Sequence, residues 1–238
     1  MPPIATRLVS VCRRPAVWIP AAVLAAATVL FWCTDLDVAI VRLFYSRDPS
    51  RGGHFPLTFA QPWKMLYDWG VYPAWILGGG GMVVWIASFF WAKLKDWRDP
   101  GLFLALLLIV GPGILVNWVF KPCWCRPRPH TTRPFGGPRE FLPVWQFGSG
   151  DDDFSFPSGH AATGFYLMAP AFVCYRRRPW LAAAFLLFGL AAGAVIGLAR
   201  IAAGGHFPSD VLWSGGIVYF TALALAAPFR FGREKAEL

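Results

Sequence analysis

The sequence predicts an all-α integral membrane protein, a single membrane-embedded domain over residues 1–238 that forms a bundle of six helices. Two observations support this fold class. Hydrophobic residues make up 56% of the chain and charged residues only 15%, whereas a soluble domain carries about 25% charged residues. The apolar residues also gather into six long runs, each close to the roughly 20 residues that cross the hydrocarbon core. Because lipid offers the backbone no hydrogen-bond partners, we expect these runs to be helices.

The six predicted spans are separated by polar or basic segments. They cover residues 15–34, 68–92, 101–120, 157–175, 181–200 and 209–228. Three arginines between residues 7 and 14 precede the first run, as in a signal peptide, but no convincing small-residue cleavage site follows, so we expect a retained span. The Gly-Pro-Gly sequence at 111–113 predicts a kink or a local break in the third span. The long connection over residues 36–66 has a helical apolar pattern near its start, which predicts a short interfacial helix.

Basic residues form four short clusters that alternate with the six runs, so all four clusters are expected on one side of the membrane. They lie within residues 7–14, 93–98, 176–178 and 230–235. Short basic loops stay inside, which predicts a multi-pass protein of the bacterial inner membrane with both termini in the cytoplasm. The net charge of +9 does not predict nucleic-acid binding, because the basic residues do not form one continuous face. No obligate protein partner is evident.

Three segments combine basic residues or histidine with the end of an apolar run. They are Lys121–Pro129 (KPCWCRPRP), Phe156–His160 (FPSGH) and Arg200–Asp210 (RIAAGGHFPSD). The predicted topology places all three at the external, periplasmic face. Ionisable groups at membrane depth are costly and usually functional. We therefore expect the three segments to converge on one site.

The predicted site has the composition of a phosphate cradle. Lys121, Arg128 and Arg200 bring up to three positive charges together, and arginine offers a planar fork that suits phosphate. Ser158 and Gly159 belong to a Pro-Ser-Gly sequence that is typical of a helix start, with the proline in the first turn. The free N–H groups of a helix start bind anions, and glycine lets the backbone approach closely.

Two histidines and an aspartate supply the predicted chemistry. His206 and Asp210 are four residues apart at the start of the last span, so the carboxylate is expected to fix the tautomer of the ring and leave its other nitrogen as a nucleophile. His160 is a candidate general acid. These groups predict phosphoryl transfer through a phosphohistidine. No carboxylate cluster for a metal is evident, so neither a metal nor another cofactor is predicted. Cys123 and Cys125 lack a second cysteine pair and are interpreted as loop residues.

These motifs resemble the signature of the type 2 phosphatidic acid phosphatase (PAP2) superfamily, which reads K-x6-RP, PSGH and SR-x5-H-x3-D. The matching residues are Lys121, Arg128 and Pro129 in the first motif, Pro157 to His160 in the second, and Arg200, His206 and Asp210 in the third. One residue departs from the pattern, because Ala199 stands where serine is usual. The resemblance covers roughly residues 117–215.

The resemblance implies a metal-independent phosphatase with a role for each matching residue. His206 attacks phosphorus, Asp210 orients it, and His160 protonates the leaving oxygen and then helps to activate water. The remaining positions hold the phosphate: Lys121, Arg128, Ser158, Gly159 and Arg200. On this basis we expect Asp210→Asn to fold normally but to lose rate. Arg126 lies outside the signature, so we expect Arg126→Ala to matter less than Arg128→Lys.

The expected substrate is a membrane lipid phosphate whose chains stay in the bilayer. The external loop at residues 133–145 is similar to that of bacterial lipid A phosphatases, and phosphatidylglycerophosphate and undecaprenyl pyrophosphate stay as further candidates. Two other functions also stay open. One is a lipid phosphotransferase that passes the phosphoryl group to an acceptor lipid. The other is a membrane anion transporter, which is less favoured because transporter sites usually lie near the midplane.

Overall fold

A computed structural model describes residues 15–48, 50, 54–149, 154–229 and 231 of the chain. Within these residues the regular structure is entirely helical, apart from one isolated bridge between Thr132 and Arg139. The predicted all-α class is therefore confirmed. The predicted basic clusters at residues 7–14 and 230–235 lie largely outside the described residues.

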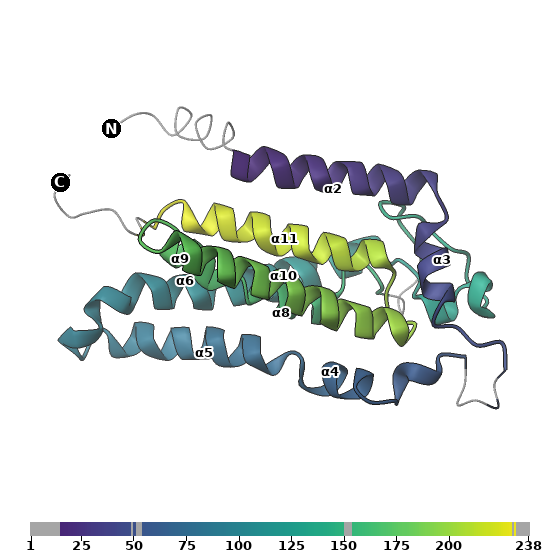
Figure 1. The fold of residues 1–238 in the computed structure, drawn as a ribbon, viewed down its shortest axis with the longest axis horizontal. Coiled ribbons are helices and arrows are strands. Elements are labelled where there is room, and N and C mark those ends of the chain that lie inside the picture. The colour runs from purple at the N-terminus through teal and green to yellow at the C-terminus, as the bar shows by residue number, and fades with distance from the viewer. Residues whose placement is uncertain (1–14, 49, 51–53, 150–153, 230, 232–238) are drawn as a thin grey trace.

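The long helices α2, α5, α10 and α11 run roughly parallel or antiparallel to one another, and the short helix α3 crosses them at one end (Figure 1). In chain order the α-helices are α2 (Pro15–Cys33), α3 (Leu36–Arg42), α4 (Trp63–Trp69), α5 (Tyr72–Ala87), α6 (Arg98–Leu108), α7 (Lys121–Trp124), α8 (Gly159–Tyr166), α9 (Ala169–Cys174), α10 (Pro179–Ala202) and α11 (Pro208–Ala226). A π-helix, η4 (Ile109–Phe120), joins α6 to α7. Short 3₁₀ helices are η2 (Pro56–Thr58), η3 (Ala92–Trp97), η5 (Pro129–Thr131) and η6 (Arg133–Phe135).

Five helical segments of the described chain are long and apolar enough to cross a membrane, where the sequence predicted six. They are Pro15–Cys33, Trp63–Ala87, Ala92–Thr131, Pro179–Ala202 and Pro208–Ala226. The predicted span at 157–175 is instead two short helices, α8 and α9. Pro170 lies in the first turn of α9, and its missing N–H cannot bond to the carbonyl four residues earlier. The helix therefore breaks between the two pieces.

The first of these pieces, α8, lies at the centre of the bundle. Nearly all its residues are buried, and its main neighbours are α10 and α11. Gly164 packs against Gly193 of α10 so closely that a Cβ on Gly164 would lie 2.8 Å from the Cα of Gly193. Small residues allow such close helix packing in membrane proteins. Helix α8, which begins within the second motif, is therefore packed closely against α10.

The third predicted span changes its helical pattern at the Gly-Pro-Gly sequence. The α-helical hydrogen bonding of α6 ends at Leu108, and the π-helix η4 carries Pro112 within it. Proline cannot donate to the helical ladder, and π-helical turns often occur where that ladder is interrupted. The side-chain amide of Asn117 donates to the carbonyl of Pro112 at 2.7 Å. This segment leads directly to Lys121 at the start of α7.

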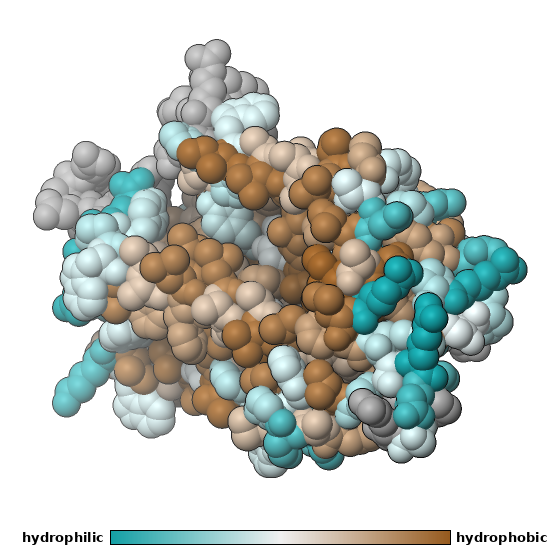
Figure 2. Space-filling model, turned by 45° about the vertical axis from the view of Figure 1, so that its right-hand side comes forward, coloured by the Kyte–Doolittle hydropathy of each residue, from teal (hydrophilic) through white to brown (hydrophobic). Residues whose placement is uncertain are grey.

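The outer surface of the bundle is apolar, as a lipid-facing surface requires. Large hydrophobic side chains are more than half exposed on α2, α5 and α10, among them Trp18, Ile76 and Leu187. Figure 2 shows hydrophobic residues over much of the visible face, with hydrophilic residues gathered towards its edges. The described chain thus has both the helix lengths and the surface of a multi-pass membrane protein.

The two ends of the bundle differ in what they carry. The basic connections at 93–98 and 176–178 lie at one end, between α5 and α6 and between α9 and α10. Helix α3, helix α4, the long segment from α7 to α8 and the start of α11 gather at the other end (Figure 1). This separation agrees with the alternation that the sequence predicted. It also places the three motif segments together.

Candidate active site

The three motif segments meet at the end of the bundle opposite the basic connections. Lys121 starts α7, Gly159 starts α8, and Arg200 lies in the last turn of α10. His206 lies in the connection to α11, and Asp210 lies in the first turn of α11. A Cβ added to Gly159 would lie 3.3 Å from Nζ of Lys121. The first motif therefore touches the start of the second, as the topology argument predicted.

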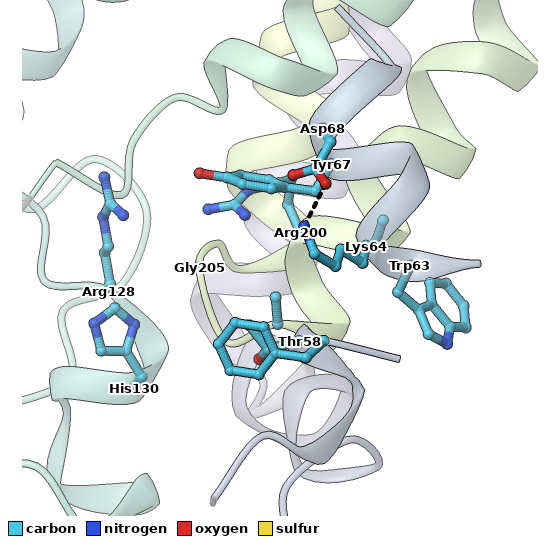
Figure 3. Close-up of a pocket in the computed structure, with 12 residues that line it drawn as sticks. Thr58, Trp63, Lys64, Tyr67, Asp68, Arg128, His130, Arg200 and Gly205 are labelled. Atoms are coloured by element: carbon cyan, nitrogen blue, oxygen red, sulfur yellow. Dashed lines mark hydrogen bonds and ion pairs between the residues drawn. The ribbon is translucent and has the colours of Figure 1, made fainter. Parts of the chain in front are cut away.

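Arg128 and Arg200 line a pocket of about 260 Å³ together with residues of α4 and of the segment that precedes it. Figure 3 shows both guanidinium groups beside this pocket. Each arginine has a buried Nε without a hydrogen-bond partner among the described residues. Neither arginine forms an ion pair with a described residue, and Lys121 forms none either. Three cations without described acidic partners favour an anionic ligand.

The N-terminus of α8 is capped by Ser158 rather than opened by the proline. The Oγ of Ser158 accepts from the N–H of Ala161 at 3.4 Å, and α8 begins at Gly159. Pro157 thus precedes the cap and does not lie in the first turn, where the sequence predicted it. The carbonyl of Ser158 accepts the first intrahelical bond, from Ala162. The N–H groups of Gly159 and His160 precede that bond beside Lys121, and helix starts of this kind can bind anions.

His160 lies against a residue that the sequence did not single out, Tyr67 of α4. The two rings stack with centroids 4.8 Å apart and an interplanar angle of 17°. The guanidinium carbon of Arg200 lies 4.4 Å from the centroid of the same tyrosine ring, and Figure 3 shows the two groups one above the other. Tyr67 therefore contacts both the candidate acid and a candidate phosphate ligand. Its neighbours Lys64 and Asp68 form an ion pair on the same wall of the pocket.

His206 is held by a backbone carbonyl rather than directly by Asp210. The ring is 2% exposed, and its Nδ1 lies 2.5 Å from the carbonyl oxygen of Ser155. A carbonyl oxygen only accepts, so Nδ1 carries the proton and Nε2 keeps its lone pair. The nearest carboxylate oxygen of Asp210 lies 3.8 Å away, too far for a hydrogen bond. In this structure the predicted direct hydrogen bond is replaced by a longer electrostatic contact between His206 and Asp210.

The electrostatic surroundings keep His206 neutral. Burial, the largest cause, lowers the pKa of His206 to about 4, and the nearby positive charges of Arg200 and Lys121 act in the same direction. Asp210 opposes this shift without cancelling it. At neutral pH the imidazole is uncharged. A neutral imidazole whose Nε2 keeps its lone pair can act as a nucleophile.

Asp210 acts as the centre of a buried hydrogen-bond network. Its Oδ1 accepts from Nη1 of Arg126 at 2.5 Å. Its Oδ2 accepts from Oγ of Ser155 at 2.6 Å and from the N–H of Phe207 at 2.7 Å. Because Ser155 also holds His206 through its carbonyl, Asp210 acts on the histidine through Ser155 and through the backbone at Phe207.

Comparison with known proteins identifies the family. The protein-family profile described as PAP2 superfamily matches residues 101–232, more than half of the chain. This chain belongs to the PAP2 superfamily. The matched region contains all three motifs and every predicted site residue, so the family predicted from the motifs is confirmed.

Proteins similar to this chain include several that are named lipid A 4'-phosphatase. The one from Francisella tularensis subsp. novicida is 38% identical over 144 residues, which is 60% of this chain and 64% of that protein. The one from Rhizobium leguminosarum is 36% identical over 120 residues, 49% of this chain and 50% of that protein. The aligned parts thus span less than two thirds of these relatives.

A solved structure with a similar arrangement is that of a transmembrane PAP2 type phosphatidylglycerolphosphate phosphatase from Bacillus subtilis. The TM-score is 0.49 and the sequence identity 18%, with 90% of this chain and 98% of that chain covered.

Two charged residues of the site were missed by the motif analysis, Arg126 and Asp37. Both are almost fully buried, at 0% and 1% exposure. Nη2 of Arg126 donates to Oδ2 of Asp37 at 2.8 Å, while its Nη1 holds Asp210. Asp37 also lies outside the region that the PAP2 profile matches. A sequence signal existed, because an aspartate in the buried stripe of a short apolar helix is costly unless it is paired.

Proposed function

We propose that this PAP2 protein is a membrane lipid phosphatase that works through a phosphohistidine. The observation that supports this most is the state of His206, whose proton is held on Nδ1 by the Ser155 carbonyl. Its Nε2 is thereby left as a nucleophile at the end of the bundle where Lys121, Arg128 and Arg200 gather. An uncharged nucleophile beside cations that form no ion pair with a described residue suits attack on an anionic phosphate.

The proposed reaction has two steps. In the first, Nε2 of His206 forms a bond to phosphorus while the ester P–O bond breaks, and His160 gives a proton to the leaving oxygen. Burial and the neighbouring cations lower the pKa of His160 to about 4 in the free protein, so this proton arrives with the phosphate monoester, whose negative charge offsets those cations. In the second, water attacks the phosphohistidine, His160 takes the proton from that water, and the P–N bond breaks to release phosphate. Lys121, Arg128 and Arg200 stabilise the negative charge on the transferred group. His160 ends each cycle in its starting state.

The N–H groups at the start of α8 complete the phosphate cradle in this proposal. Ser158 caps the helix and Gly159 allows close approach of Lys121. Asp210 keeps His206 in place through Ser155. Such preorganised donors act at the moment when charge develops, which is why they lower the barrier.

The proposed substrate is a lipid phosphomonoester. An apolar surface around the helices and a pocket at one end allow acyl chains to stay in the bilayer while the phosphate reaches Arg128 and Arg200. The other charged residues on the pocket wall, Lys64 and Asp68, neutralise each other. Among the described residues that line the pocket, no further lysine or arginine lacks an acidic partner, which supports a monophosphate over a diphosphate. The relatives named lipid A 4'-phosphatase make lipid A the first substrate to test.

To test the proposal, purified protein is incubated with each of four lipids, with and without an acceptor lipid, and the released phosphate is measured. The lipids are lipid A, phosphatidylglycerophosphate, phosphatidic acid and undecaprenyl pyrophosphate. We expect release from a phosphomonoester lipid without any acceptor. Transfer that strictly requires an acceptor would indicate a phosphotransferase. Failure with every lipid, by protein whose thermal unfolding is cooperative, would refute the proposed activity.

Activity should not depend on divalent cations, and vanadate should inhibit it. Lys121, Arg128, Arg200 and helix N–H groups supply the charge stabilisation in the proposed mechanism, so EDTA is expected to change the rate by less than about twofold. Vanadate forms a trigonal-bipyramidal adduct that resembles the transition state and should bind more tightly than phosphate, by about 100-fold. Rates measured in EDTA with added vanadate or phosphate test both points. A strict Mg²⁺ requirement would contradict this mechanism.

The active site is proposed to face the periplasm, with the basic connections in the cytoplasm. Ser149 and Arg177 are both exposed and lie in loops on opposite ends of the bundle. In a variant whose five native cysteines are replaced, a membrane-impermeant thiol reagent should label Ser149→Cys in spheroplasts and should label Arg177→Cys only after lysis. Labelling of Arg177→Cys alone in closed cells would invert the topology.

A further inference from the structure

Arg126 is the largest fully buried side chain of the described protein and is charged. Its Nε donates to the carbonyl of Leu142 at 2.9 Å, and its Nη1 donates to Ser209 Oγ at 2.8 Å as well as to Asp210. Its Nη2 donates to Asp37. The guanidinium also lies 4.5 Å from the ring centroid of Phe207. The group is thus fixed from several directions by segments far apart in the sequence.

Asp37 fastens helix α3 to the start of α11. Its Oδ1 accepts from the N–H of Ser209 at 2.9 Å, and its Oδ2 accepts from the Oγ of the same serine at 2.6 Å. Ser209 lies in the first turn of α11, where a carboxylate stabilises the free N–H groups and the positive end of the helix dipole. Figure 1 shows α3 lying at this end of the bundle. The start of α11 is therefore held from outside the PAP2-matched region.

A continuous chain of contacts leads from these two residues to the nucleophile. Arg126 holds one oxygen of Asp210, and the other oxygen holds Ser155 Oγ and the N–H of Phe207. The Ser155 carbonyl then holds Nδ1 of His206. Phe207 follows His206 directly in the chain, so the backbone is fixed on that side as well. A shift of Arg126 is transmitted to the direction in which Nε2 points.

Arg126 differs in role from the arginines of the cradle. Arg128 and Arg200 each keep a buried nitrogen without a partner and line the pocket. Each nitrogen of the Arg126 guanidinium, in contrast, donates to a protein oxygen. Its charge is balanced by Asp37 and Asp210. Arg126 therefore uses its hydrogen bonds on protein groups, and we do not count it among the phosphate ligands.

We propose that Arg126 and Asp37 are positioning residues that aim His206 at phosphorus through Asp210 and Ser155. This inference rests on the proposed phosphohistidine mechanism and extends it to α3. It reverses the expectation that Arg126 would matter less than Arg128 because it lies outside the signature. The helix α3, which the sequence predicted only as an interfacial helix, then becomes part of the active-site support.

The test compares Arg126→Lys and Asp37→Asn with wild type, and uses Arg133→Ala as the matched control. Arg133 is an exposed arginine of the same loop, and its ion-pair partner among the described residues is the exposed Glu140. We measure kcat and KM, the inhibition constant of inorganic phosphate, and the inhibition constant of vanadate. Phosphate reports the cradle alone, whereas vanadate also bonds to His206 in the proposed site. Comparing the two inhibitors therefore distinguishes an effect on the orientation of His206 from an effect on anion binding.

Arg126→Lys and Asp37→Asn are expected to lower kcat by about 100-fold, the size of effect that a misplaced reacting group produces. The inhibition constant of phosphate should stay within about twofold of wild type, and that of vanadate should weaken by about 10-fold or more. Arg133→Ala should change none of these values. A milder variant, Ser209→Ala, removes hydrogen bonds without unpairing a charge. It should lower kcat by about fivefold with phosphate binding unchanged.

Three results would overturn the inference. One is a kcat within about twofold of wild type for Arg126→Lys and for Asp37→Asn, which is too small for misplacement of the nucleophile. Another is an equal loss of phosphate and vanadate binding, which would assign these residues to the cradle or to general stability. If the charged variants do not fold, an unchanged kcat for Ser209→Ala would overturn it. Inactive wild-type protein would instead refute the proposed function itself, so the two failures are distinguishable.

Discussion

Replacing His206 with alanine should abolish phosphate release, lowering kcat by a factor of about 10⁴ or more, the scale seen when a covalent nucleophile is removed. The structure places no other neutral imidazole in the same setting, because only His206 among the described histidines has Nδ1 held by the Ser155 carbonyl. Single-turnover assays with labelled lipid phosphate should trap a phosphoenzyme in wild type and none in His206→Ala. The protein should still fold, since a neutral ring is removed.

The matched control for this prediction is His54→Ala. His54 is an exposed histidine whose Nδ1 also contacts a backbone carbonyl, that of Ser46. Its replacement should leave the rate unchanged. Near-normal phosphate release by His206→Ala would rule out the phosphohistidine mechanism, whatever the substrate proves to be. Because the pKa of His206 is lowered to about 4, wild type should still form the phosphoenzyme at pH 6, where an imidazole of ordinary pKa would be largely protonated.

Asp210→Asn should damage both rate and stability. Asparagine keeps the shape of the side chain but removes one of the two charges that balance Arg126. Breaking a buried ion pair costs about 3 kcal/mol or more, which for a chain of this size corresponds to a fall of about 6 to 12 °C in Tm. The position of Ser155 and His206 should also loosen, so kcat is expected to fall by about 10² to 10⁴-fold. Thermal unfolding in detergent and steady-state rates measure the two effects.

This expectation replaces the one drawn from the sequence, that Asp210→Asn would fold normally. The control is Asp96→Asn, an exposed aspartate near the other end of the bundle, which should alter neither Tm nor kcat. An Asp210→Asn protein with wild-type Tm would show that the network around Arg126 contributes little to stability. One with a wild-type kcat would show that Asp210 does not influence His206.

Hydropathy alone predicted most of the helical architecture. Runs of apolar residues long enough to cross a bilayer can only be helices, because the backbone must satisfy its own hydrogen bonds. Local chemistry also predicted the disturbance at Gly-Pro-Gly in the third span, which the structure shows as the π-helix η4. The prediction that the fourth span is a single helix was wrong. Hydropathy does not distinguish a buried helix from a lipid-facing one, and the weight of Pro170 in the middle of an apolar run was overlooked.

The motifs themselves were readable from the sequence, and the alternation of basic clusters brought them to one end of the bundle. Lys121, Arg128 and Arg200 each stand at the end of an apolar run. A charge at such a position is costly and therefore visible without a structure. The resemblance to the PAP2 superfamily rested on the same residues, and the family match confirms it. These inferences needed only spacing along the chain.

The partners of those residues were decided by the tertiary structure alone. The sequence places Asp210 four residues from His206 and so suggested a direct hydrogen bond, but the fold inserts the Ser155 carbonyl at Nδ1 and turns the carboxylate towards Arg126. Asp37, which also belongs to this network, lies 172 positions before Ser209 in the chain. No local spacing encodes such a contact, because it depends on how α3 packs against the start of α11. The sequence determined which groups are proposed to carry the chemistry, whereas the packing of distant helices decided what holds them in place.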